Sequence, residues 1–187
     1  MTATTKGPLL RRVRSDEITR ALRPPVDAST LAAAQQIVER VRGEGRGALV
    51  AFAAEFGERT PEQTLILGRD EMRAALAALP EESRDTLARA ADRIRVFAQA
   101  QRDAIQTTEL TIPGGRAGHT VEPVASAGGY APAGRYPLPS SVLMTAVTAR
   151  VAGCERVVVA SPGANPVALA AAAIADADAF LCVGGAH

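Results

Sequence analysis

Residues 157–183 read VVVASPGANPVALAAAAIADADAFLCV, and this stretch decides the fold. Two short apolar runs, 157–160 and 179–183, flank a segment at 166–175 that is rich in alanine. Continuous apolar strands joined by helical crossovers are typical of parallel sheets that are covered by helices. We therefore predict a strand, a helix and a second parallel strand here, in a sheet covered on both faces.

The pattern extends upstream from this stretch. Residues 140–152 form an apolar run that suits a helix, and 121–125 and 128–131 are weaker strand candidates. Together with 157–183 they predict a βαβαβ order. The expected fold class is α/β: a helical amino-terminal region followed by the first βαβαβ part of an incomplete Rossmann-like parallel sheet.

Before residue 110 the periodicity is helical. Apolar residues recur at spacings of three and four over 29–42, and a glycine-rich break separates this helix from a second one that ends at Gly57. Residues 65–67 suit a short strand, and helices follow from Asp70 and from Glu81. We expect Ser29 or Thr30 to cap the first helix and Asp70 to cap the third.

The charged residues are distributed unevenly along the chain. Residues 111–187 carry four basic and four acidic side chains, whereas residues 1–110 carry 17 and 16. A buried sheet explains a low density of charge. We therefore divide the chain into a mostly helical region, 1–112, and the start of a Rossmann-like domain, 113–187.

Charge and composition exclude several classes of partner. A net charge of +1 leaves no cationic excess to follow a nucleic-acid backbone. No apolar run approaches the ~18 residues of a membrane-spanning helix, and residues 1–10 lack the apolar core of a secretory signal. Cys154 and Cys182 show no CxxC spacing. We expect a cytoplasmic protein with reduced, buried cysteines that binds neither nucleic acid nor membrane.

Parallel α/β sheets bind ligands beyond the carboxyl ends of their strands. Three segments rich in Gly, Pro or Ser occupy such positions here, at 129–135, 161–163 and 184–187, and none matches GxGxxG. Ser140 and Ser141 open the next helix, where their hydroxyls could cap the helix or bind phosphate.

The first of these segments is the most specific one. Residues 128–144 read GGYAPAGRYPLPSSVLM, residues 183–186 read VGGA, and Leu22-Arg23-Pro24 lies upstream. These residues resemble the signature of the histidinol dehydrogenase family, and the resemblance covers essentially the whole chain. It implies an NAD-dependent and zinc-dependent homodimer that oxidises L-histidinol through L-histidinal to L-histidine in histidine biosynthesis.

The resemblance assigns two cofactor-binding residues in this chain. Tyr130 occupies the position of the family's NAD-contacting tyrosine, where a flat phenol could contact adenosine; a core or surface tyrosine is the alternative, and the surrounding motif favours cofactor contact. His187 replaces a glutamine that contacts NAD in the family, and imidazole cannot offer the paired donor and acceptor of an amide. Ala133 also departs from the family, in place of a glycine.

The family's catalytic Glu-His pair and its zinc ligands have no counterpart in this chain. His119 has no second ligand at metal-binding spacing, so we expect a surface or hydrogen-bonding histidine there. We therefore interpret the chain as an inactive amino-terminal fragment of a longer enzyme. The alternatives are a paralogue that oxidises another small polar alcohol, and a non-catalytic binding or assembly protein that lacks the catalytic half.

Overall fold

The computed structural model describes residues 26–133 and 136–187. Leu22-Arg23-Pro24 of the family resemblance, and Gly134 and Arg135 of the first strand-end segment, lie outside these ranges. The helices are α1 (Ala28–Glu44), α2 (Arg46–Glu55), α3 (Arg69–Ala78), α4 (Glu81–Asp103), α5 (Pro139–Ala152) and α6 (Pro166–Ile174). The strands are β1 (Ile66–Leu67), β2 (Thr108–Ile112), β3 (Gly115–His119), β4 (Ser126–Tyr130), β5 (Arg156–Ala160) and β6 (Ala179–Leu181).

The main sheet has four strands in the order β1-β6-β5-β4. Strands β4, β5 and β6 are parallel, and β1 pairs antiparallel with β6. The predicted βαβαβ order is confirmed, running from β4 through α5, β5 and α6 to β6. All three parallel strands therefore end at the same edge of the sheet.

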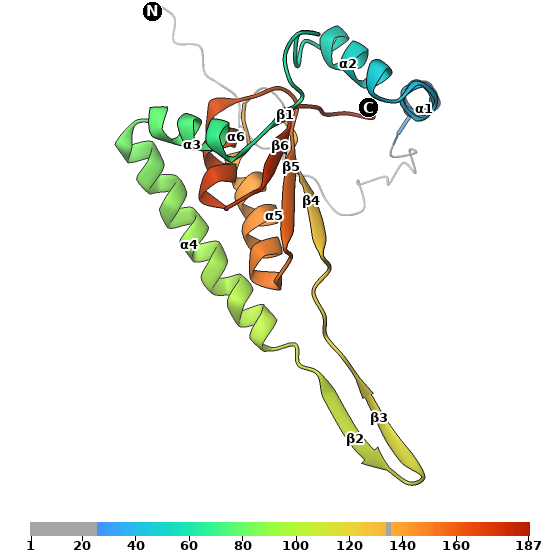
Figure 1. The fold of residues 1–187 in the computed structure, drawn as a ribbon, viewed down its shortest axis with the longest axis vertical. Coiled ribbons are helices and arrows are strands. Elements are labelled where there is room, and N and C mark those ends of the chain that lie inside the picture. Colours follow the sequence, from blue (N-terminus) through green and yellow to red (C-terminus); the bar gives the residue numbers. More distant parts are fainter. Residues whose placement is uncertain (1–25, 134–135) are drawn as a thin grey trace, which may run out of the picture.

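The two crossover helices lie together on one face of this sheet. Val157, Val159 and Phe180 point into the core with α5 and α6, and α3 and α4 pack outside those helices (Figure 1). The prediction that both faces are covered is confirmed only in part, because on the face opposite α5 and α6 residues of α2 pack beside Leu181 of β6 but β4 is largely exposed. Right-handed crossovers between strands in sequential order place both helices on the same side. In the described ranges, Gly128 and Tyr130 on the other face are exposed.

Close packing of α5 on β4 depends on Gly129. A Cβ at this position would lie 2.6 Å from the Thr145 hydroxyl oxygen on α5, which is too close for any side chain. The core around it is made of small residues, and Ala146, Ala170 and Ala171 are fully buried. The alanine-rich composition is therefore the reason that helices and sheet approach so closely.

The amino-terminal helices form where the apolar spacing predicts them, but with different caps. Asp27 caps α1, since its carboxylate accepts hydrogen bonds from the Ser29 hydroxyl and the Thr30 amide. These bonds, the Ser29 bond foremost, hold the pKa of Asp27 well below its usual range. Helix α3 begins after Gly68, which replaces the predicted Asp70 as cap. The N-cap residues are therefore Asp27 for α1 and Gly68 for α3, each upstream of the predicted cap.

A long hairpin, β2–β3, projects away from the body of the protein (Figure 1). Every residue of both strands is exposed. The predicted strand at 121–125 was wrong, because this segment only connects the hairpin to β4. The turn of the hairpin lies at the predicted division between residues 112 and 113, and that division stays a prediction.

A cluster of charges closes the amino ends of β5 and β6. Asp178 accepts hydrogen bonds from the Val157 amide at 2.7 Å and from the guanidinium groups of Arg69 and Arg150, each at 2.6 Å. Burial alone would raise the pKa of Asp178, but these three donors lower it to about 2. The cluster ties α3 and α5 to the sheet.

No helix in the described ranges has the length and apolar character needed to cross a membrane. Cys154 and Cys182 are buried and free, as predicted. Burial raises the pKa of the Cys182 thiol.

Candidate functional site

The carboxyl ends of β4, β5 and β6 bring together the three segments that the sequence singles out. Tyr130 ends β4, Pro162 follows β5, and Gly184, Gly185 and His187 follow β6. We call these five residues the strand-end site. It lies where open α/β sheets bind ligands.

Tyr130 contacts the turn that follows β6. Its side chain is on an exposed position at the end of β4, and its hydroxyl accepts a long hydrogen bond, 3.4 Å, from the Gly185 amide. The residue is 50% exposed. A ring that is fixed at its hydroxyl and open on its surface can pack against a flat ligand.

The turns after β5 and β6 also pack tightly on each other. A Cβ at Gly184 would lie 2.2 Å from Cγ of Pro162, so only glycine fits there. Ser161 is buried, and its amide donates to the Leu181 carbonyl at 3.0 Å. These contacts make the two turns a single surface beside Tyr130.

His187 is enclosed by residues from the segment around the end of α2. Its imidazole is 1% exposed, and its Nε2 lies 2.8 Å from Oε2 of Glu58. The ring centroid lies 5.2 Å from that of Phe56, and 6.3 Å from that of Phe52. The imidazole Nδ1 is buried without a hydrogen-bond partner. His187 therefore lies at the strand-end site with its ring turned against Glu58.

Glu58 was missed by the sequence analysis. It is 126 residues away from Gly184, and no motif surrounds it. Its side chain is 9% exposed, and the same Oε2 accepts a hydrogen bond from the Gly184 amide at 3.2 Å. No local pattern could have identified it, because the contact exists only when α2 lies across the end of β6.

The two helix starts near this edge differ. Asn165 caps α6 and accepts hydrogen bonds from the Val167 and Ala168 amides. Helix α5 begins at Pro139 without a side-chain cap, so the predicted capping by Ser140 or Ser141 was wrong. Phosphate binding by these serines stays a prediction.

The strand-end site combines an aromatic ring with a glycine-rich turn. The ring is half exposed and no side chain fits at Gly184, while the amides of Gly184 and Gly185 already donate to Glu58 and to the Tyr130 hydroxyl. These residues fit the adenosine part of NAD. They supply contacts for binding, whereas hydride transfer itself is the chemistry of the bound cofactor.

Zinc does not fit the described residues. Within 26–133 and 136–187, no three His, Cys, Asp or Glu side chains converge at metal-binding distance. His119 is exposed, and its Nε2 lies 3.0 Å from the Gln106 carbonyl oxygen, as expected for a surface histidine. The described part of the chain therefore forms no zinc site by itself.

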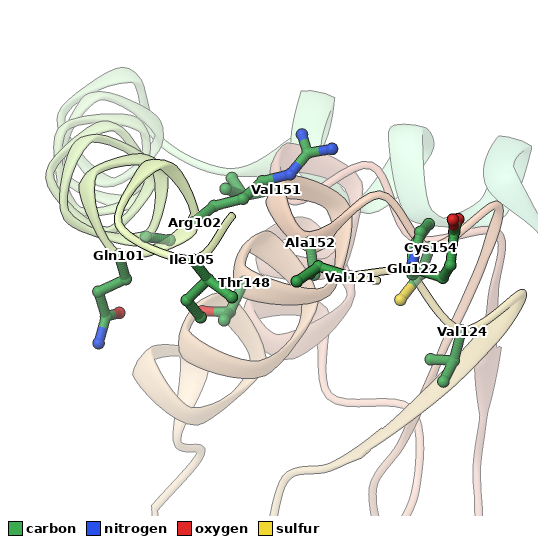
Figure 2. Close-up of a pocket in the computed structure, with 12 residues that line it drawn as sticks. Gln101, Arg102, Ile105, Val121, Glu122, Val124, Thr148, Val151, Ala152 and Cys154 are labelled. Atoms are coloured by element: carbon green, nitrogen blue, oxygen red, sulfur yellow. The ribbon is translucent and has the colours of Figure 1, made fainter. Parts of the chain in front are cut away.

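A second concave surface lies at the opposite end of the sheet. It is a groove of about 420 Å³ between α4, α5 and the segment that leads into β4. Figure 2 shows Ile105, Val121 and Val151 among its lining residues. The lining is mainly apolar and has no paired acid and base, so the groove is the weaker candidate for chemistry.

Comparison with known proteins identifies the family of this chain. The family model described as histidinol dehydrogenase matches residues 23–187. Histidinol dehydrogenase of Aromatoleum aromaticum is 38% identical over 167 residues, which cover 86% of this chain and 38% of that protein. The chain belongs to the histidinol dehydrogenase family.

The chain is also similar to a protein with another named activity. Sulfopropanediol 3-dehydrogenase of Ruegeria pomeroyi is 35% identical over 155 residues, covering 80% of this chain and 35% of that protein. A crystal structure of histidinol dehydrogenase from Elizabethkingia anophelis has the same fold, with a TM-score of 0.75 at 24% identity. The structural match covers 88% of this chain and 39% of the Elizabethkingia anophelis chain. The chain spans about two fifths of these relatives, since the shares lie between 35% and 39%.

Proposed function

We propose that this chain is the amino-terminal, cofactor-binding part of an NAD-dependent histidinol dehydrogenase. The whole enzyme oxidises L-histidinol through L-histidinal to L-histidine, in histidine biosynthesis. The observation that carries the proposal is the pairing of Tyr130 with the Gly184–Gly185 turn at the carboxyl edge of the sheet, within a chain of this family. Tyr130 contacts the adenosine part of NAD, and His187, whose buried imidazole is bound to Glu58, supports the turn beside it.

The described residues have roles in binding and orientation. The Tyr130 ring offers a flat surface to the cofactor, while the Gly185 amide holds its hydroxyl. The tight contact between Gly184 and Pro162 leaves no room for a side chain between the two turns. NAD, when bound, accepts the hydride. The zinc ligands and the catalytic base belong to the part of the family's length that this chain does not span, so the 187-residue chain alone has no turnover.

The test has two arms. Calorimetric titration of the 187-residue chain with NAD should give saturable binding, and L-histidinol should give no NADH with this chain alone. The longest translated product of the gene, loaded with zinc, should reduce NAD with L-histidinol and behave as a homodimer in light scattering. No binding of NAD to either form contradicts the proposal.

A second candidate substrate is another small polar alcohol. The similarity to a sulfopropanediol 3-dehydrogenase and the histidine at position 187 favour it. Comparing L-histidinol with a sulfonated diol as substrate of the whole enzyme separates the two candidates. A continuation of the reading frame without a Glu-His pair would instead support a non-catalytic binding protein.

A further inference from the structure

Glu58 connects the helical region to the strand-end site through one buried oxygen. Its Oε2 lies 3.2 Å from the Gly184 amide nitrogen and 2.8 Å from Nε2 of His187. Both partners donate, so one carboxylate oxygen holds the first and last residues of the four-residue turn 184–187. A charge that is 9% exposed needs such partners, because burial without them is costly.

Glu58 is itself held firmly by its neighbours. Its amide donates to the Ala53 carbonyl at 2.8 Å, which ties it to the end of α2. Its own carbonyl oxygen lies 3.5 Å from the position of a Cβ at Gly163, in the turn after β5. Phe56, two residues earlier, packs on the His187 ring. Glu58 therefore touches the turns that follow both β5 and β6.

The contacts continue from this turn to β4. The residue after Gly184 is Gly185, whose amide donates to the Tyr130 hydroxyl. Tyr130 and Glu58 thus accept hydrogen bonds from adjacent amides of the same turn. If the carboxylate is lost, the Gly184 amide and the His187 ring lose their shared acceptor, and Gly185 loses its fixed position under Tyr130.

We propose that Glu58 is a positioning residue for cofactor binding. It sets the geometry of the turn 184–187 relative to Tyr130, and it acts through Gly184 and His187 without touching the cofactor. This inference rests on the proposed function, because it assigns the turn and Tyr130 to NAD. It adds the α2 segment, which lies far from the motifs, to the elements that determine NAD affinity.

The experiment compares E58A and E58Q with the parent 187-residue chain. Glutamine has an amide oxygen that can accept both hydrogen bonds, whereas alanine has no acceptor. E55A is the matched control, because Glu55 is exposed at the end of the same helix. NAD affinity is measured by calorimetry. Exchange of the Gly184 and Gly185 amides is followed by NMR without cofactor, and the unfolding midpoint is measured for each variant.

We expect E58A to weaken NAD binding about tenfold or more, as loss of an orienting partner does at other sites. E58Q should stay closer to the parent than to E58A, and E55A should match the parent. Faster exchange of the two glycine amides should accompany the loss in E58A. Rescue by E58Q at an unchanged unfolding midpoint distinguishes positioning from a purely structural role.

The inference is overturned if the NAD affinity of E58A equals that of the parent, or if the amides of Gly184 and Gly185 exchange equally fast in E58A and the parent. A loss of affinity in E58Q as large as in E58A also overturns it. Failure of the parent chain to bind NAD contradicts the proposed function instead. In that case the amide exchange in E58A still decides whether Glu58 positions the turn.

Discussion

The hydroxyl of Tyr130 accepts a hydrogen bond from the amide of Gly185, although the two residues follow strands that are separated by β5. The bond crosses the carboxyl edge of the sheet and orients an aromatic ring that is half exposed. The ring surface and the hydroxyl can therefore be tested separately.

Removal of the Tyr130 ring should weaken NAD binding more than removal of its hydroxyl. We expect Tyr130→Ala to raise the dissociation constant about tenfold, because a stacked base is worth ~1–3 kcal/mol. Tyr130→Phe keeps the ring and should have a smaller effect. Phe97→Ala, at an exposed aromatic residue on α4, is the control in the same titration. Equal affinity of Tyr130→Ala and the parent would contradict the assignment.

A methyl group at Gly184 should separate the turns after β5 and β6. Its Cβ would lie 2.2 Å from Cγ of Pro162, and a proline ring cannot move aside. Gly184→Ala should lower the free energy of unfolding by ~1–3 kcal/mol, measured by urea denaturation. Gly128→Ala is the matched control on β4, since a Cβ there meets nothing within 4 Å. Equal losses in both variants would show that the contact is unimportant.

The charge cluster at Asp178 should contribute to stability. Asp178→Asn removes a carboxylate that accepts from one amide and two guanidinium groups, so we expect a loss of ~2 kcal/mol in the free energy of unfolding. Asp176→Asn should cost ~0.5 kcal/mol or less, because its ion pairs are exposed. Thermal and urea unfolding of both variants provide the measurement, and the reverse order of losses would refute this interpretation.

The same carboxylate should make stability depend on pH in acid. The pKa of Asp178 is about 2 in the folded protein, below its ordinary 3.8. A lowered pKa means that the unfolded chain binds the proton more readily, so this contribution is complete above about pH 4 and is lost as the pH falls through about 2. Urea unfolding at several pH values between 2 and 5 gives the free energy of unfolding at each pH. This free energy should change less with pH in Asp178→Asn than in the parent. The same change with pH in both proteins would exclude the effect.

The cysteines should react slowly in the folded protein. Both Cys154 and Cys182 are buried, and the pKa of Cys182 is raised by burial, so little thiolate is present at neutral pH. A chromogenic disulfide reagent should detect two thiols in urea and modify them far more slowly without it. Rapid modification of both thiols in the native protein would indicate that the core is open.

The sequence predicts the parallel part of the fold because buried strands and helices appear in it as continuous apolar runs. Strand β5 and helix α6 are continuous apolar runs, and their positions differ from the prediction by no more than one residue at either end. The hairpin β2–β3 was missed because both strands are exposed and carry few apolar residues, the alternation in β2 being limited to Leu110 and Ile112. The Pro113-Gly114 pair at its turn was the available signal.

The site could be predicted only in part, for a physical reason. Tyr130 and the glycines after β6 stand at strand ends, and strand ends follow from local pattern. Glu58 reaches the same place only through the packing of α2 beside Val183 and Leu181. The placement of α5 and α6 on the same face of the sheet depends on the order of the strands, and apolar runs in the sequence do not reveal that order.

The projecting hairpin β2–β3 has a thermodynamic consequence. A pair of strands that buries nothing against the body opens and closes without disturbing the core, because an isolated hairpin is only marginally stable. Hydrogen exchange at residues 108–119 therefore reports the local opening of the hairpin β2–β3 and carries no information on global unfolding. A ligand that ordered the hairpin would slow exchange there and leave the exchange of β5 unchanged.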